Sequence, residues 1–233
     1  MKLVKLIANL GYGSRKEAQR MIRSGAVTDD TGRILGANEM PPHALIRVRG
    51  KPLDPPFPLA VILNKPDGYT CGREDPGATI YDLLPPRFAC RNPGLQPIGR
   101  LDKDTTGMLL LTDDGKLLHR IVHPKSSCLK VYHATLDRPL DGHEAALFAS
   151  GTLVLNSETK PLLPAALTMR GEKSALIILH EGRYHQVRRM FAAAGNHVLT
   201  LKRISIGGLH LPDNLPEGEW RILTPDELAA VFR

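Results

Sequence analysis

The chain has 233 residues, of which 42% are apolar and 24% are charged, and its formal net charge is +7. A chain of this length can bury a substantial core in one or two domains, and it has no apolar run long enough to cross a bilayer. Its three cysteines, Cys71, Cys90 and Cys128, are widely spaced, which excludes a Cys-x-x-Cys zinc site and argues against a disulfide framework. We therefore expect a protein of the reducing cytoplasm, and the positive charge suggests a polyanionic partner.

The basic excess lies in the N-terminal segment. Residues 1–51 hold ten Lys or Arg and four Asp or Glu, so the remaining residues carry a net charge of only about +1. Lys5 interrupts the first apolar stretch and no small-residue cleavage site follows it, so we expect no signal peptide. Ser14-Arg15-Lys16-Glu17 is a capping box, in which the serine and glutamate side chains each satisfy a backbone N–H at a helix start.

The helix predicted after Ser14 has a basic side. Its cations fall within roughly 140° of arc, whereas Ala18, Met21 and Ile22 lie on a separate apolar arc. The cations are Arg15, Lys16, Arg20 and Arg23. A solvated helix face is the ordinary explanation, but this grouping, opposed only by Glu17, favours contact with RNA. The first fifty or so residues, predicted as two short helices followed by strands, are similar to an S4-type RNA-binding domain.

A proline-rich segment divides the chain. Residues 52–58 contain four prolines, a density that disfavours both helices and central strands. We therefore predict an S4-like domain over residues 1–51, a linker over 52–58 and a second domain over 59–233.

The second domain alternates strands and helices. Apolar and alternating runs predict strands near residues 59–63, 107–112, 130–134, 174–179 and 197–201, and helices near 116–122, 142–150, 184–194 and 226–232. Thr224, Pro225 and Glu227 provide the cap of the last helix, and Gly195 is a C-cap residue for the one before it. This arrangement predicts an α+β fold with a mixed, largely antiparallel sheet flanked by helices.

The stretch Gly99-Arg100-Leu101-Asp102 places a cation and a carboxylate at a corner before an apolar run. An opposite charge nearby keeps a carboxylate ionised, and an ionised, well-positioned aspartate can act as a nucleophile or a base. For an isolated Arg-x-Asp sequence, a structural ion pair in a turn would be the simpler explanation.

Five stretches together resemble the motifs of the RsuA family of pseudouridine synthases. The longest is Gly99–Thr112, and the second is Glu181–Met190, which includes Gly-Arg-Tyr-His-Gln-Val-Arg-Arg-Met. The others are Asn64–Gly68 (Asn-Lys-Pro-x-Gly), Lys130-Val131-Tyr132 (Lys-x-Tyr) and Val198–Gly207. The resemblance covers essentially the whole chain and implies the pseudouridine synthase fold.

The resemblance also implies roles for individual residues. Asp102 would be the catalytic carboxylate, Arg183 its ion-pair partner, and Tyr132 an aromatic face and proton-handling group against the target base. Arg100 would fill the gap left by a flipped base, and Leu201 would form an apolar wall. Lys130 and Arg188 are further candidates for substrate contact, although helix cations such as Arg188 are often only solvated. His119 and His185 lack ligands at metal-binding spacing, so we expect polar or RNA-contacting roles for them.

The implied reaction is the isomerisation of one uridine to pseudouridine in 16S ribosomal RNA, at uridine 516. The base leaves the ribose through nitrogen, rotates and rejoins through carbon, so we expect no cofactor and no metal. The target base must be flipped into a pocket. The sequence leaves open whether Asp102 attacks the ribose or removes a proton. It also leaves open a 23S RNA target and a non-catalytic assembly factor. We expect a monomer acting on ribosomal RNA, within a partly assembled small subunit.

Overall fold

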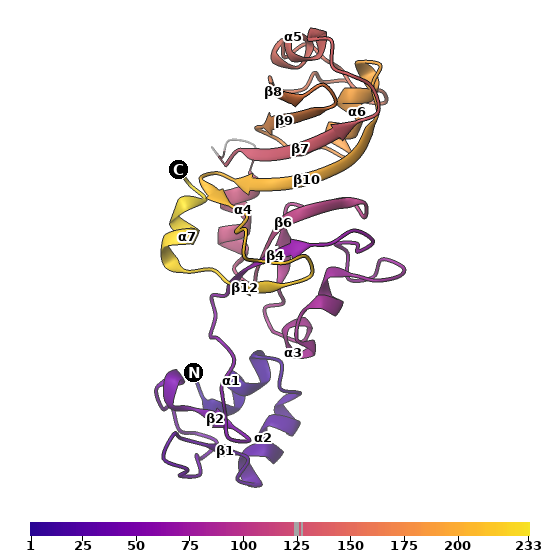
Figure 1. Cartoon of the computed structure of the whole chain (residues 1–233). Helices are drawn as coiled ribbons and strands as arrows, with labels where there is room; N and C mark the ends of the chain where they lie inside the picture. Colours follow the sequence, from indigo (N-terminus) through magenta and orange to yellow (C-terminus); the bar gives the residue numbers. More distant parts are fainter. Residues whose placement is uncertain (124–125, 127) are drawn as a thin grey trace.

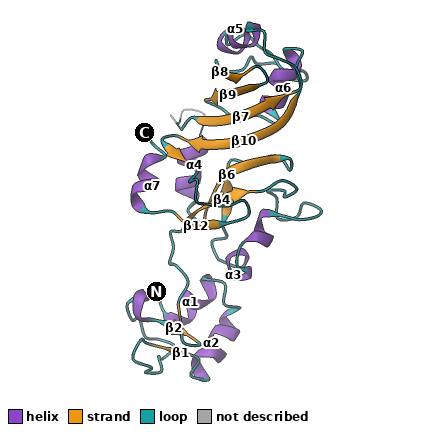
Figure 2. Ribbon diagram, viewed as in Figure 1, coloured by secondary structure: helices purple, strands orange, loops and turns teal. Residues whose placement is uncertain are grey.

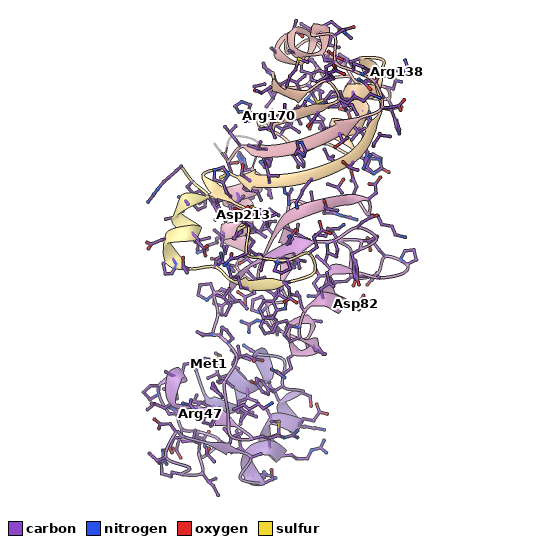
Figure 3. All side chains as sticks on the ribbon, in the orientation of Figure 1. Met1, Arg47, Asp82, Arg138, Arg170 and Asp213 are labelled. Atoms are coloured by element: carbon purple, nitrogen blue, oxygen red, sulfur yellow. The ribbon has the colours of Figure 1, made fainter. Side chains whose placement is uncertain are left out.

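The computed structural model describes every residue of the chain except 124, 125 and 127. The molecule is elongated, with a small N-terminal unit at one end and a long, twisted sheet that fills the rest (Figure 1). Figure 3 shows this separation, with Met1 and Arg47 in the small unit and Arg138 and Arg170 near the opposite end. The expected α+β fold is confirmed.

The N-terminal unit contains two helices and a three-stranded sheet, as the sequence predicts. The helices are α1 (Leu3–Asn9) and α2 (Arg15–Arg23), and the sheet has the order β1 (Val27–Thr28), β2 (Arg47–Val48) and β3 (Lys51–Pro52), with a 3₁₀ turn, η1, at His43–Leu45. The capping box forms: the Ser14 hydroxyl accepts from the N–H of Glu17 at 3.3 Å, and the Glu17 carboxylate accepts from the N–H of Ser14 at 2.7 Å. Leu53 packs into the core of this unit, so the unit extends past residue 51 into the proline-rich segment.

The end of α1 docks on the larger unit. The Tyr12 hydroxyl accepts from the N–H of Asp54 at 3.1 Å, and Asp54 pairs with Arg87 at 2.6 Å. Gly11 has a φ of +87°, and a Cβ there would lie 2.1 Å from the carbonyl oxygen of Arg87. Only glycine fits this close approach, so this contact holds the S4-like unit against α3 (Pro86–Ala89).

The larger unit is built on a nine-stranded mixed sheet (Figure 2). Its main path runs β12-β4-β6-β10-β7-β9-β8, with β5 beside β6 and β11 beside β10. The strands are β4 (Ala60–Lys65), β5 (Gln96–Ile98), β6 (Thr105–Thr112), β7 (Lys130–Leu136), β8 (Ala166–Gly171), β9 (Ser174–Leu179), β10 (Val198–Ile206), β11 (Leu209–His210) and β12 (Trp220–Ile222). The pair β6–β10 is parallel and the other pairs are antiparallel.

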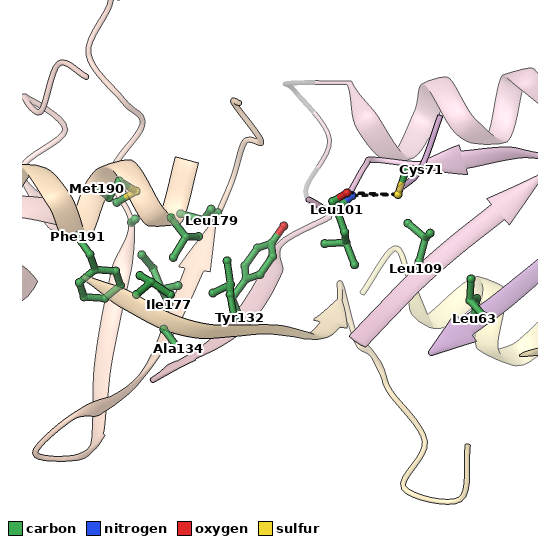
Figure 4. Packing of buried hydrophobic residues seen from close by; sticks show 14 of the residues in the cluster. Leu63, Cys71, Leu101, Leu109, Tyr132, Ala134, Ile177, Leu179, Met190 and Phe191 are labelled. Carbon is green, nitrogen blue, oxygen red and sulfur yellow. Dashed lines mark hydrogen bonds between the residues drawn. The ribbon is translucent and has the colours of Figure 1, made fainter. Parts of the chain in front are cut away.

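Helices cover both faces of this sheet at β4 and β6, whereas β7 and β9 are buried on one face only. Alternate residues of a strand point to opposite faces, and in β4 and β6 both sets are buried: Leu63 and Leu109 face one core, and Ile62 and Met108 face the other. The first core is closed by η2 (Ile80–Leu83), α3, α5 (His143–Ala149) and α6 (Gln186–Ala193). The second is closed by α4 (Gly115–Val122) and α7 (Pro225–Ala230). Figure 4 shows part of the first core, from Phe191 and Met190 to Leu63.

Several boundaries differ from those that the sequence predicts. Strands β5, β8, β11 and β12 have no counterpart among the predicted elements: β5 is three residues long and includes Pro97, β11 has only two residues, and β8 is an exposed strand at the end of the sheet path. Helix α6 begins two residues later than expected because His185 has a φ of +49°, outside the helical region. Strand β10 continues five residues beyond the predicted end at Leu201. No helix in the described part of the chain is long and apolar enough to cross a membrane.

Candidate active site

A pocket of about 560 Å³ opens where the loop after β5 meets β7, β10 and the segment before α6. Six of the residues singled out from the sequence line it: Arg100, Asp102, Lys130, Tyr132, Arg183 and Leu201. These residues come from four distant parts of the chain. The pocket also includes Cys71, His185 and Arg203, to which the sequence assigned no catalytic role.

The parallel pairing of β6 with β10 brings two of the motifs together. Leu201 lies opposite Thr105, and Arg203 lies opposite Gly107. Gly107 has a φ of +96°, and a Cβ there would lie 2.3 Å from the carbonyl oxygen of Arg203. The glycine in the Asp102 motif therefore allows the close approach of the two strands at the pocket wall.

Lys65 holds the loop that carries Asp102 through hydrogen bonds to its backbone. This side chain is fully buried, and its ammonium group donates to the carbonyl oxygens of Pro66, Lys103 and Thr105 at 3.0, 3.0 and 2.8 Å. Burial lowers the pKa of Lys65. Lys65 of the Asn-Lys-Pro motif thus fixes the backbone on both sides of Asp104.

Cys71 holds the same loop at Leu101, the residue before Asp102. Its sulfur lies 3.4 Å from both the N–H and the carbonyl oxygen of Leu101 (Figure 4). The thiol is buried, and this burial raises its pKa, so it stays protonated and can donate to the carbonyl. The carboxylate of Asp102 therefore extends from a loop that is anchored before and after it.

The side chain beside the Asp102 carboxylate is a histidine rather than the expected arginine. Its side chain is 28% exposed, and its Oδ1 lies 3.5 Å from Nε2 of His185. Arg183 instead pairs with Glu158 and Glu181 and donates to the carbonyl oxygens of Lys160 and Pro161. Two carboxylates, Glu158 and Glu181, occupy its guanidinium, so the expected Arg183–Asp102 ion pair does not form in this structure.

Arg203 is the buried cation of the pocket. It is 2% exposed, and its Nε donates to the carbonyl oxygen of Met108 at 2.8 Å. The other guanidinium nitrogens lie 3.4 Å from the Tyr132 hydroxyl and 3.4 Å from the carbonyl oxygen of Gly99. Across the described residues, no carboxylate forms an ion pair with it. The strand period could have found it, because Arg203 is two residues after Leu201 and so shares its face.

The walls of the pocket include one aromatic and one apolar side chain, and its rim is charged. Tyr132 is 9% exposed and Leu201 is buried, so both can form walls against an aromatic ligand. In Figure 4 the Tyr132 hydroxyl points toward the side on which Leu101 and Cys71 lie. Lys130 lines the pocket, and burial lowers its pKa. The Arg100 side chain faces solvent at the rim, since it is 68% exposed and its ion pair is with Asp75 at 3.2 Å.

Arg188 lies outside the pocket lining. It pairs with Asp104 at 2.9 Å and donates to the carbonyl oxygen of Val198 at 2.9 Å. These contacts tie α6 to the loop after Asp102 and to the start of β10. The geometry therefore favours a structural role for Arg188 over the substrate contact that we expected.

The basic side of α2 is available to a partner. All four cations are exposed, and within the described residues none of them takes part in an ion pair, whereas Ala18 and Ile22 are buried. The cations are Arg15, Lys16, Arg20 and Arg23. Such a face can bind an RNA backbone through its phosphates.

One group outside the pocket has the composition of a metal site. In the part of the chain that the structure describes, Asp141, His143 and Glu144 at the start of α5 are the residues whose ligand atoms lie together within 4.8 Å. His143 already bonds to Asp141, and Glu144 accepts from the N–H of Gly142 at 3.1 Å. These bonds explain the cluster without an ion.

Family models match both units of the chain. The model for RNA pseudouridylate synthase matches residues 60–193, and the model for the S4 domain matches residues 1–30. The first match contains the loop of Asp102, the strand of Tyr132 and the whole of α6.

Similar proteins and a solved structure agree with these matches. The Ribosomal small subunit pseudouridine synthase A of Escherichia coli strain K12 is 42% identical, over 99% of this chain and 100% of the relative. The protein of the same name from Vibrio cholerae is 38% identical over the full length of both. A crystal structure described as a pseudouridylate synthase covers 99% of both chains with a TM-score of 0.70 and 36% identity. The chain therefore belongs to the RNA pseudouridine synthases, in the RsuA group that carries an N-terminal S4 domain.

Proposed function

We propose that the chain converts uridine 516 of 16S ribosomal RNA to pseudouridine, with Asp102 as its catalytic residue. The observation that carries this proposal is the position of Asp102, on an anchored loop in a pocket with an aromatic wall, an apolar wall and a buried cation. The names of the relatives, which refer to the small ribosomal subunit, support the choice of RNA.

Each pocket residue has a separate role in the proposed reaction. A flipped uracil stacks on Tyr132 and rests against Leu201. Asp102 acts at the ribose or on its proton while the bond from the ribose to the base nitrogen breaks and the bond to the base carbon forms. Arg203, rather than Arg183, supplies the positive charge that the pocket offers to a developing anion. Arg183 holds the segment around Glu158 in place.

The S4-like unit supplies affinity for the RNA backbone. Its four exposed cations on α2 bind independently of sequence, and the target base itself is selected at the pocket. We infer that the substrate is a partly assembled small subunit and that the protein acts as a monomer in the cytoplasm. The three cysteines are free thiols, which suits a reducing compartment.

The test uses small-subunit RNA labelled with tritium at carbon 5 of uridine, both naked and loaded with early assembly proteins. Isomerisation moves that carbon onto the ribose and releases its tritium to water. We expect about one equivalent per RNA, abolished in Asp102→Asn at nearly unchanged RNA affinity. Release from large-subunit RNA alone would overturn the target, and release by Asp102→Asn would overturn the role of Asp102.

The role of Arg203 is tested with the same label. Arg203→Met should change kcat more than KM, because the charge acts on the reacting atoms. Arg183→Met should act mainly through the stability of the protein, since its partners are Glu158 and Glu181. The opposite pattern would restore Arg183 as the functional cation.

A further inference from the structure

The rim of the pocket carries an aromatic side chain that the fold does not use. Tyr184 is 74% exposed, more than any other large apolar or aromatic side chain in the described part of the chain. It lines the pocket together with Asp102, but the other aromatic of the pocket, Tyr132, is buried at 9%. Exposed tyrosines of this kind are enriched where proteins bind partners, because the ring has an apolar face and a polar tip.

The ring of Tyr184 is already held flat. It stacks on the imidazole of His185, with ring centroids 3.8 Å apart and an interplanar angle of 17°. One face of the tyrosine therefore covers His185, and the high exposure of the residue leaves the other face to solvent.

The backbone below this stack is fixed at several points. His185 has a φ of +49°, and α6 begins directly after it. The carbonyl oxygen of Tyr184 accepts from Arg189 at 3.1 Å, and the N–H of Arg183 donates to the Gln186 side chain at 2.8 Å. The backbone thus presents the two rings as a unit. The two rings are therefore already ordered before a base binds, which lowers the entropy cost of binding.

The stack is coupled to the catalytic residue. The imidazole of His185 stacks against the Tyr184 ring, and its Nε2 lies 3.5 Å from Oδ1 of Asp102. A ligand on the open face of Tyr184 would therefore be two rings away from the carboxylate, outside the space in which Tyr132 and Leu201 hold the target base. This position suits a nucleotide next to the target in the RNA strand.

We propose that the Tyr184–His185 stack is a platform for the base of a nucleotide that flanks the target uridine. Unpaired RNA bases stack on aromatic side chains in this way. The platform accepts a flanking base through its π-face, without reading the edge of that base, and it orders the strand for entry into the pocket. This inference rests on the proposed active site at Asp102.

The first test compares Tyr184→Ala with Tyr184→Phe, which keeps the ring. Without the stacked base, KM for the RNA should rise roughly tenfold to a hundredfold in Tyr184→Ala, with a smaller change in kcat, and Tyr184→Phe should stay close to the wild type. Leu199→Ala is a matched control, because Leu199 is exposed on β10 and does not line the pocket. Equal KM values for the alanine and wild-type proteins would overturn the platform, as would equal KM increases in the alanine and phenylalanine variants.

A second test observes the stacking directly. RNA fragments carry 2-aminopurine at one position after another on either side of the target uridine and are bound to Asp102→Asn, which should hold RNA without turnover. Fluorescence should be quenched at a flanking position, and the quenching should disappear when Tyr184→Ala is added. Quenching that does not depend on Tyr184 would overturn the inference.

The two proposals fail in different ways. Tritium release by Asp102→Asn would refute the proposed catalytic residue, and the quenching would still report on the platform. Normal release by the wild type together with unchanged KM and quenching in Tyr184→Ala would refute the platform and leave the proposed function standing.

Discussion

Lys65 should set the position of the loop that carries Asp102, and Lys65→Met tests this directly. Methionine keeps the apolar stem of the side chain and removes the ammonium group that donates to Pro66, Lys103 and Thr105. The side chain is completely buried, so water cannot take over these bonds without opening the structure.

The expected cost follows from two opposing effects. Each hydrogen bond from a charged donor contributes about 1.5–3 kcal/mol, but methionine also removes the desolvation cost of the buried charge, which is reflected in the lowered pKa of Lys65. We therefore expect the free energy of unfolding to fall by about 2–4 kcal/mol. For a chain of this size that change lowers Tm by about 4–16 °C.

Activity should fall more steeply than stability. A displacement of about 1 Å of a catalytic group can cost about a hundredfold in rate, so kcat for tritium release should drop by about that factor well below the Tm of the variant. RNA affinity should change little, because the cations of α2 belong to the N-terminal unit at one end of the molecule (Figure 1). Lys116→Met is the control, since Lys116 is exposed on α4. A variant with reduced Tm and normal kcat would refute the positioning role of Lys65.

Three further predictions concern binding and stability. Changing the four cations of α2 to glutamine should weaken RNA binding and reduce the slope of log K against log salt by about 0.7–0.9 for each phosphate that the variant no longer neutralises; an unchanged slope would remove this face from the RNA site. Asp113→Ala should cost about 3–5 kcal/mol in urea unfolding, because it leaves Arg91, which is 2% exposed and 2.7 Å from Asp113, as an unpaired buried charge; a cost below about 1 kcal/mol would contradict the structure. Hydrogen bonds from Arg221 lower the pKa of Glu227 from 4.5 to about 2, so its stabilising effect is present above pH 4.5 and disappears as the pH falls toward 2. Glu227→Gln should flatten the decline of stability across that interval, and an acid limb identical to that of the wild type would refute the assignment.

The agreement between sequence and structure is closest where the signal is local. The capping boxes at Ser14 and Thr224 form, and β9 has the predicted bounds, Ser174–Leu179. A cap depends on residues three positions apart, and a strand signal depends on alternation over a few residues. Strand β8 escaped prediction because it pairs with β9 at an exposed end of the sheet path and has no regular alternation in burial.

The site shows the same division. The motifs located the pocket, because six of the residues chosen from the sequence line it. They did not identify the partner of Asp102. An ion pair depends on which side chains lie close together in space, and in this fold Glu158 and Glu181 lie within ion-pair distance of Arg183.

By itself, the sequence determined the family, the α+β class, the capped helices and the loop that carries Asp102, because each of these depends on residues that are close together along the chain. Only the tertiary structure decided which cation lies in the pocket and what holds the loop. Arg203 enters through the parallel pairing of β6 with β10, and Lys65 reaches the carbonyl group of Thr105, 40 residues further along the chain. Such contacts depend on strand order and register, which bring together residues that no local pattern connects.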